Sequence, residues 1–323
     1  MLLAGAGSHA ARGQPGIPAA AGGPPAAGAA GAPTGAGPRL ALLIGNAAYR
    51  RAPLQNPVND ARLLASALRP LGFDTEVHEN LVLHDLIETL REFSLRSRAA
   101  EVRLLFYAGH GLQVRGRNYL VPVDSDIATE EEIPAATADA NEFVDRLGQL
   151  GGLSIVILDA CRNNPYSGAE VLGPDGRRYR FRGTTRDGLA ALPAPAGTIV
   201  AFSTSPGGVA LDHPGAAHGL YARHLAGNLA VPGLTIEGLF KRVRAAVSRD
   251  SRKMQVPWES SSLTGDFCFR PGPRGGCGTE SGELDQPNGR TPISAPWSQN
   301  AKAAQAMSPA TIATAVPATV PAG

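Results

Sequence analysis

Two residues of this chain carry side chains that together could perform nucleophilic catalysis. Cys161 follows a short apolar run, and His110 stands between two glycines about 50 residues earlier. A thiol attacks a carbonyl carbon as the thiolate, which at neutral pH needs a nearby imidazole or other positive group. The backbone amides of Gly111 and Cys161 are candidates to hold the developing oxyanion, because glycine has no side chain to block the approach. The predicted chemistry is acyl transfer from a peptide bond.

The segments before these two residues are typical of buried strands. The run Leu-Ser-Ile-Val-Ile-Leu-Asp at 153–159 is rich in β-branched residues, and 101–108 is rich in Leu, Phe and Tyr. Cys161 and His110 then follow the carboxyl ends of two strands, which is where ligands bind in open parallel sheets. The glycines beside His110 have no side chain to pack, which lets another backbone or a ligand approach closely. His110 is therefore not expected to serve only as a residue of the core.

Other strands and helices alternate along the chain. We expect further strands at 40–45, 73–78 and 197–203, a strand or hairpin arm at 118–123, and edge pieces at 255–258 and 266–269. Apolar residues at helical spacing predict helices at 57–69, 83–98, 138–150, 216–229 and 235–248. This alternation predicts an α/β fold with a mostly parallel sheet, helices on both faces and right-handed crossovers.

Composition divides the chain into a folded part and two extensions. Residues 1–38 and 271–323 are rich in Gly, Pro, Ala, Ser and Thr, so both are predicted to be disordered, which leaves one domain at 39–270. A net charge of +2 gives no reason to expect nucleic acid or a membrane surface as partner. No stretch reaches transmembrane length, and the compartment stays open: cytoplasmic as written, exported if the start has lost a signal peptide.

The chain has three cysteines, and an odd count points to a reactive thiol. Cys268 and Cys277 are close enough to pair in an oxidising compartment, but their flexible surroundings favour two surface thiols. They have no second Cys/His pair at zinc-finger spacing.

Four motifs together resemble the caspase superfamily. They are Leu-Leu-Ile-Gly-Asn at 42–46, Pro-Val-Asn-Asp at 57–60, Tyr-Ala-Gly-His-Gly at 107–111 and Asp-Ala-Cys-Arg-Asn-Asn-Pro at 159–165. Over about 39–269 the chain is similar to bacterial metacaspase-like, orthocaspase-type peptidases of family C14. The resemblance implies a caspase-hemoglobinase three-layer sandwich, with His110 as general base and Cys161 as nucleophile. It also implies a large-subunit-like part at 39–165, an Arg-rich loop at 166–195 and a small-subunit-like part at 196–270.

Two acidic residues match the metacaspase specificity pocket. Asp159 stands where a caspase has Gln, two residues before the nucleophile, and Asp60 matches the other acidic position of the S1 pocket. Two carboxylates there would accept an Arg or Lys residue before the cleaved bond (P1) and repel an acidic one. Each also has a plainer interpretation, because Asp159 could cap a turn and Asp60 could lie in a solvated first helical turn. Their joint match favours the pocket.

Two further features bear on regulation. If the pocket selects Arg, the segment 177–186, which contains five arginines, is a candidate self-processing site, or else a solvated basic loop. Metacaspases often need calcium, but the carboxylates of Asp124, Asp126, Asp139 and Glu142 are few for an ion that takes six or more oxygens. We therefore predict no metal site and no cofactor, and calcium dependence stays open.

Two other functions compete with a monomeric endopeptidase acting on peptide or protein substrates. A phosphatase-like cysteine enzyme would need Arg six residues after the nucleophile, where this chain has Ser167. A caspase-like interaction module without activity is the stronger alternative, since a protein can keep its fold after losing its catalytic activity. The presence of both His110 and Cys161 argues against it.

Overall fold

A central sheet of six strands carries the fold. The computed structural model describes residues 37–160, 170–172, 178–180, 189–206 and 215–278. The strand order is β11-β10-β7-β3-β1-β2, and all neighbours are parallel except the antiparallel pair of β10 and β11. The bounds are β1 Arg39–Gly45, β2 Phe73–Glu79, β3 Val102–Ala108, β7 Leu153–Asp159, β10 Thr198–Phe202 and β11 Trp258–Ser261.

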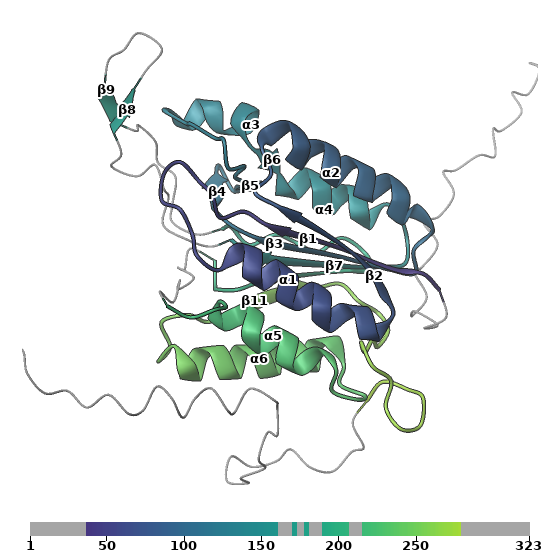
Figure 1. Ribbon diagram of the computed structural model, residues 1–323. Helices are drawn as coiled ribbons and strands as arrows, with labels where there is room; N and C mark the ends of the chain where they lie inside the picture. Colours follow the sequence, from purple (N-terminus) through teal and green to yellow (C-terminus); the bar gives the residue numbers. More distant parts are fainter. Residues whose placement is uncertain (1–36, 161–169, 173–177, 181–188, 207–214, 279–323) are drawn as a thin grey trace, which may run out of the picture. The chain divides into compact units, whose positions relative to one another are not determined.

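Helices cover both faces of this sheet (Figure 1). One core joins alternate strand residues to α1, α5 and α6, and a second core joins the intervening ones to α2 and α4. On β1, Ala41 and Leu43 belong to the first core, and Leu42 and Ile44 to the second. The bounds are α1 Pro57–Leu68, α2 Leu83–Arg96, α4 Ala140–Gly148, α5 Leu220–Leu229 and α6 Ile236–Asp250. This confirms the predicted three-layer α/β fold, with strands β3, β7 and β10 buried along their whole length.

Shorter elements surround this frame. A three-stranded sheet consists of β4 Gly111–Val114, β5 Arg117–Leu120 and β6 Ala138–Asp139, and α3 spans Ile133–Ala136. Single 3-10 turns cover Arg69–Leu71, Ser97–Ala99 and Glu130–Glu132. Within 166–195, which the sequence predicts to be structureless, β8 Glu170–Leu172 pairs with β9 Arg178–Arg180. Most of the candidate self-processing segment 177–186 lies outside the described residues.

The carboxyl-terminal end of the domain differs from the prediction. Cys268 and Cys277 form a disulfide with a Cα–Cα distance of 5.4 Å, so the expectation of two surface thiols is wrong. A turn in which the Gly272 amide bonds to the Gly276 carbonyl brings the two cysteines together, and the Gly278 amide bonds to the Gly233 carbonyl at 2.8 Å. Residues 271–278 are therefore ordered, although the sequence places them in a disordered tail. The cause is a cross-link that composition does not reveal.

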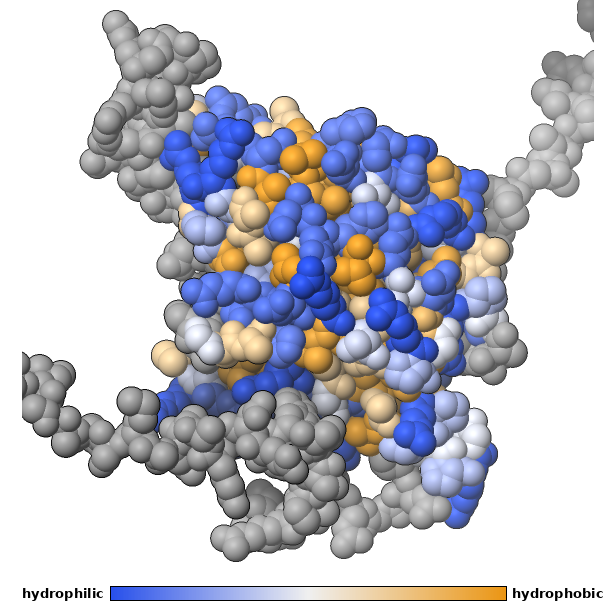
Figure 2. All heavy atoms as spheres, in the orientation of Figure 1, coloured by the Kyte–Doolittle hydropathy of each residue, from blue (hydrophilic) through white to orange (hydrophobic). Residues whose placement is uncertain are grey.

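The surface of the domain is mixed. The face in Figure 2 carries mostly hydrophilic side chains, with apolar ones in small groups between them. Among the described helices, none combines the length and the apolar character needed to cross a membrane.

Candidate active site

His110 lies two residues after the end of β3, and the backbone and side chains around it fix its ring. The side chain is 3% exposed, and its Nε2 atom lies 2.7 Å from the carbonyl oxygen of Ala52. A carbonyl can only accept a hydrogen bond, so Nε2 carries the proton and Nδ1 is the basic nitrogen of the neutral ring. Ala52 has a φ of 49°, a left-handed backbone that directs this carbonyl at the histidine. The ring is thus oriented as a base.

Two tyrosines form hydrogen bonds to the backbone of His110. The Tyr49 hydroxyl accepts a 2.8 Å bond from the His110 amide, and the two rings are 4.3 Å apart. The Tyr107 hydroxyl lies 2.9 Å from the carbonyl oxygens of both His110 and Val121. Burial raises the pKa of Tyr107 well above its ordinary value, so this phenol stays a donor. Tyr107 is in the Tyr-Ala-Gly-His-Gly motif, whereas no sequence signal identifies Tyr49 or the Ala52 carbonyl as parts of the site.

Gly111 marks the contact between the ends of β3 and β7. Ala108 pairs with Asp159 in the sheet, so the two strands end at the same level. A Cβ on Gly111 would lie 2.5 Å from the carbonyl oxygen of Ala160, the residue before Cys161. Only glycine permits this approach. The backbone next to His110 and the backbone leading to Cys161 are therefore in contact.

The amide of Gly111 is directed away from the small sheet. Val121 donates to the His110 carbonyl at 3.1 Å, which makes these two residues a hydrogen-bonded pair. The next pair, Gly111 and Leu120, is then a non-hydrogen-bonded one, because the two kinds alternate in antiparallel strands. This geometry agrees with the predicted use of the Gly111 amide as an oxyanion donor.

Cys161 itself lies outside the described residues. The cysteine count nevertheless singles it out. Of the three cysteines, Cys268 and Cys277 are joined to each other, which leaves Cys161 as the remaining one.

The structure brings Asp60 and Asp159 together, although 99 residues of chain separate them. A Cβ built on Gly219 would lie 2.8 Å from Asp60 Oδ2 and 3.8 Å from Asp159 Oδ2. Asp60 is 2% exposed and accepts the Gly219 amide with both oxygens, at 2.9 and 3.2 Å. A solvated position in the first turn of α1 is therefore excluded for Asp60. Asp159 is 8% exposed at the end of β7, so two buried carboxylates share one location.

Comparison with known proteins identifies the family of this chain. Residues 38–268 match the Peptidase C14 family, the caspase domain. The chain belongs to the caspase-domain family of cysteine peptidases. The caspase-superfamily resemblance is thereby confirmed, and the bacterial metacaspase-like type stays an expectation.

Individual relatives match over part of their length or in their fold. The human mucosa-associated lymphoid tissue lymphoma translocation protein 1 is 28% identical over 195 residues, covering 59% of this chain and 22% of that protein. The mouse homologue is also 28% identical over 195 residues, covering 21% of its length, so the match spans about a fifth of these relatives. The crystal structure of caspase-1 from Spodoptera frugiperda has a TM-score of 0.50 at 20% identity, covering 73% of this chain and 91% of that one. This likeness concerns the fold.

The carboxylates considered for calcium are spread over the caspase domain and engaged with protein groups. The Asp124 carboxylate accepts the Leu83 amide at 2.9 Å, Asp126 pairs with Arg51, Asp139 pairs with Arg117, and Glu142 pairs with Arg146. In the part of the chain that the structure describes, no three His, Cys, Asp or Glu side chains are grouped as metal ligands would be.

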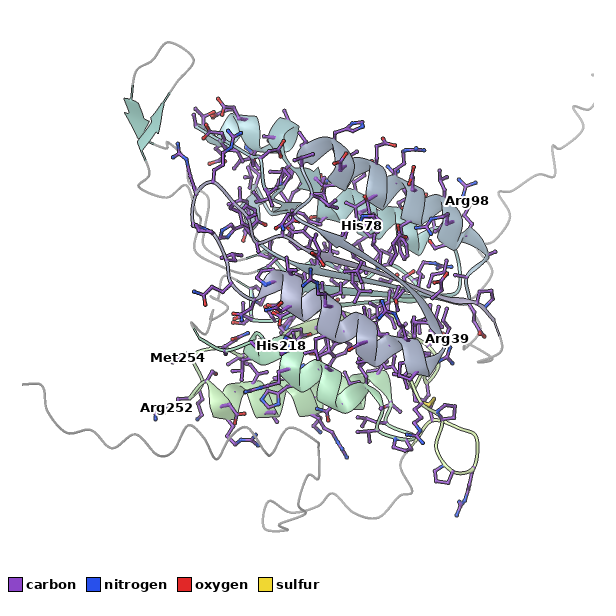
Figure 3. All side chains as sticks on the ribbon, in the orientation of Figure 1. Arg39, His78, Arg98, His218, Arg252 and Met254 are labelled. Atoms are coloured by element: carbon purple, nitrogen blue, oxygen red, sulfur yellow. A yellow bond between two sulfur atoms is a disulfide. The ribbon has the colours of Figure 1, made fainter. Side chains whose placement is uncertain are left out.

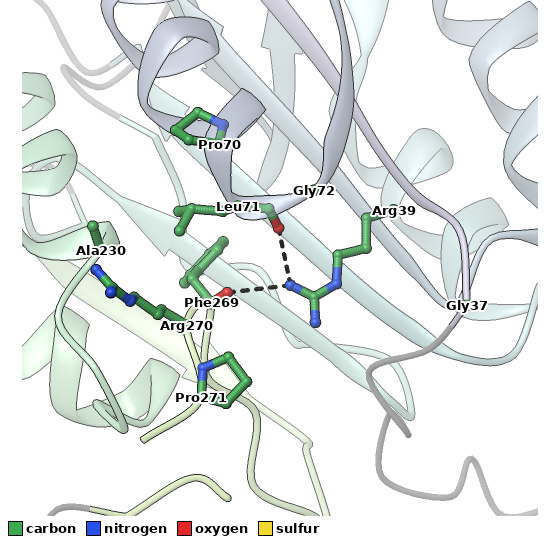
Figure 4. A pocket seen from close by; sticks show the side chains of 9 residues that line it. All are labelled: Gly37, Arg39, Pro70, Leu71, Gly72, Ala230, Phe269, Arg270 and Pro271. Carbon is green, nitrogen blue, oxygen red and sulfur yellow. Dashed lines mark hydrogen bonds between the residues drawn. The ribbon is translucent and has the colours of Figure 1, made fainter. Parts of the chain in front are cut away.

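A hollow of about 640 Å³ lies at the opposite end of the strands, where β1 begins (Figure 4). Arg39 borders it and donates from Nη1 to the carbonyls of Leu71 and Phe269, at 3.2 Å each. His110 follows the other end of the strands, so this hollow is not part of the caspase site.

Proposed function

We propose that this caspase domain is an endopeptidase that cleaves after Arg or Lys, with Cys161 as nucleophile and His110 as general base and acid. The observation that carries the proposal is the contact of Gly111 with Ala160, which joins the backbone of the base to that of the nucleophile. The second support is the orientation of His110, whose Nε2 is held by the Ala52 carbonyl while Nδ1 takes up the proton.

The reaction follows from these groups. His110 Nδ1 accepts the thiol proton, and the thiolate sulfur bonds to the carbonyl carbon of the substrate. The π electrons of that carbonyl move to its oxygen, and the resulting oxyanion is stabilised by the Gly111 and Cys161 amides. The tetrahedral species collapses to a thioester, and the leaving amine takes the proton from His110. Water then gives a proton to His110 and attacks the thioester, which releases the acid and the thiolate. The Ala52 carbonyl stabilises the imidazolium by accepting from Nε2 at 2.7 Å.

The preference for a basic P1 residue is supported by the acidic pair. A guanidinium group that reaches the space beside Gly219 meets both Asp60 and Asp159, whose oxygens lie within 4 Å of one point. Buried carboxylates bind a cation strongly and exclude an anion. We propose no metal for the reaction, and calcium is one arm of the test.

The test is a set of fluorogenic peptides that differ only at P1, carrying Arg, Lys, citrulline or Asp, with and without calcium. We expect hydrolysis of the Arg and Lys peptides by the wild-type chain and none by Cys161→Ala. No hydrolysis of any peptide by wild-type chain would favour the inactive interaction module.

Self-processing in the 177–186 segment follows from the same specificity and is proposed with it. Purified wild-type chain is expected to be cut there after Arg. Equal cutting of purified Cys161→Ala would exclude self-cleavage.

A further inference from the structure

A short segment, residues 215–219, is bound side by side to the start of α1. The contacts are made by four polar residues of the 55–60 stretch, each to a different residue of the segment. Gln55 Oε1 accepts from Gly215 N at 3.4 Å, Asn56 Nδ2 donates to Ala216 O at 2.7 Å, Asn59 Nδ2 donates to Ala217 O at 3.1 Å, and Asp60 accepts from Gly219 N at 2.9 Å. This series of bonds fixes the segment against the acidic pair.

His218 belongs to this segment and borders the acidic pair from its solvent side. Its Nδ1 atom lies 3.4 Å from Asp60 Oδ1, and its side chain is 32% exposed while that of Asp60 is 3% exposed. The next residue, Gly219, faces both carboxylates. Figure 3 shows His218 near α1 and α5, far from Arg39, which lies at the other end of the strands. His218 is therefore the more exposed neighbour of Asp60 and adjoins the residue that faces both carboxylates.

We propose that His218 is a third specificity-determining residue of this pocket and sets its charge according to pH. Neutral His218 leaves the pocket with two carboxylates to bind a P1 guanidinium. Protonated His218 cancels one of these charges and repels the incoming cation. The proposal rests on the proposed function, since it concerns the same S1 pocket.

The charged groups around His218 determine when it is neutral. Asp60 on α1 faces His218 at 3.4 Å, Asp159 on β7 lies beside the next residue, Gly219, and Arg223 on α5 opposes protonation. Burial lowers the pKa of His218 below its ordinary value, and Arg223 lowers it further. At neutral pH His218 is then uncharged, and the preference for a basic P1 residue declines as the pH falls through this lowered pKa, which lies below the ordinary imidazole value of about 6.5.

The test compares two substrates on the full chain between pH 5 and pH 8. One has Arg at P1 and the other citrulline, its uncharged isostere, and the readout is the ratio of their kcat/KM values. The titration of Cys161 and His110 affects both substrates alike and cancels in this ratio. In wild-type chain we expect the Arg/citrulline ratio to fall roughly threefold to tenfold from pH 7.5 to pH 5.5, the range for a partly screened charge pair. In His218→Gln the fall disappears.

The matched control is His224→Gln on α5. His224 Nε2 lies 2.8 Å from Asp250 Oδ2, and burial lowers its pKa as well, but its carboxylate partner is on α6 and not in the pocket. This variant is expected to keep the wild-type fall in the ratio. His218→Asn provides a second neutral amide should His218→Gln fold poorly.

The outcomes separate this inference from the proposed function. If no enzyme form prefers Arg over citrulline at pH 8, the proposed function is wrong. If Arg is preferred, a flat ratio in wild-type chain, or an equal fall in wild type and both His218 variants, overturns the role of His218 alone.

Discussion

Substituting Gly219 by alanine places a methyl group between the two acidic side chains. Its Cβ would lie 2.8 Å from Asp60 Oδ2, closer than a carbon and an oxygen normally approach, and 3.8 Å from Asp159 Oδ2. The backbone itself tolerates alanine, because Gly219 has φ −61° and ψ 150°. The effect of Gly219→Ala is therefore confined to the space that the methyl group occupies.

The size of the effect follows from the surroundings of Asp60. Asp60 as a whole is 2% exposed and its carboxylate is bonded through both oxygens to the Gly219 amide, so the carboxylate has little room to move away. A P1 guanidinium that can no longer reach the pair loses charge-assisted hydrogen bonds of about 1.5–3 kcal/mol. We expect kcat/KM for the P1-Arg peptide to fall by roughly 10- to 150-fold relative to the citrulline peptide. Overpacking lowers the free energy of unfolding by about 1–3 kcal/mol.

The assay measures kcat/KM for both peptides at pH 8, with thermal unfolding to confirm the fold. Gly227→Ala is the matched control, because Gly227 lies in α5 and a Cβ there meets no atom within 4 Å. An Arg/citrulline ratio in Gly219→Ala equal to that of wild type would refute the assignment of the pocket. An equal loss for both peptides would point to general disruption instead.

Three other substitutions test neighbouring parts of the account. Tyr49→Phe leaves the buried His110 amide without its 2.8 Å acceptor, so we expect a loss of about 1–3 kcal/mol in unfolding free energy and a lower kcat, measured by denaturant titration and peptide hydrolysis. Asp60→Asn keeps an acceptor for the Gly219 amide but removes a charge, so the P1-Arg preference should drop while the Asp peptide is no longer repelled as strongly; an unchanged P1 profile would count against the acidic pocket. Cys268→Ala removes the disulfide to Cys277 and should lower the free energy of unfolding by about 2–3 kcal/mol with little change in kcat/KM, because the cross-link is remote from His110; comparing wild-type melting with and without reductant checks the same point.

Features with a strong local signal were predictable from the sequence. The strands β1, β3 and β7 agree with the prediction to within a residue, because continuous apolar runs report burial on both faces. Helix α5 begins at Leu220 and not at 216, because the carbonyls of Ala216 and Ala217 bond to the start of α1 and not to their own helix. Contacts of this kind depend on tertiary structure and leave no local pattern.

The candidate site was also predictable only in part, where its residues belong to a local motif. His110 and Asp159 were identifiable because each ends a strand within a motif, and the sheet then places those strand ends side by side. Whether Asp60 was solvated or buried depended on Gly219, which is 159 residues away in sequence. The Ala52 carbonyl was not predictable, because any residue supplies a carbonyl and only the fold directs it at the imidazole.

The central claim is that His110 activates Cys161 for attack, and covalent labelling tests it most directly. With Cys268 and Cys277 joined, Cys161 is the remaining thiol, so intact-mass measurement after treatment with a P1-Arg peptidyl chloromethylketone reports on it without other cysteines. We predict one adduct per wild-type chain, located at Cys161, with labelling abolished in Cys161→Ala and strongly slowed in folded His110→Ala. Labelling of His110→Ala at the wild-type rate, or an adduct elsewhere, would contradict the account.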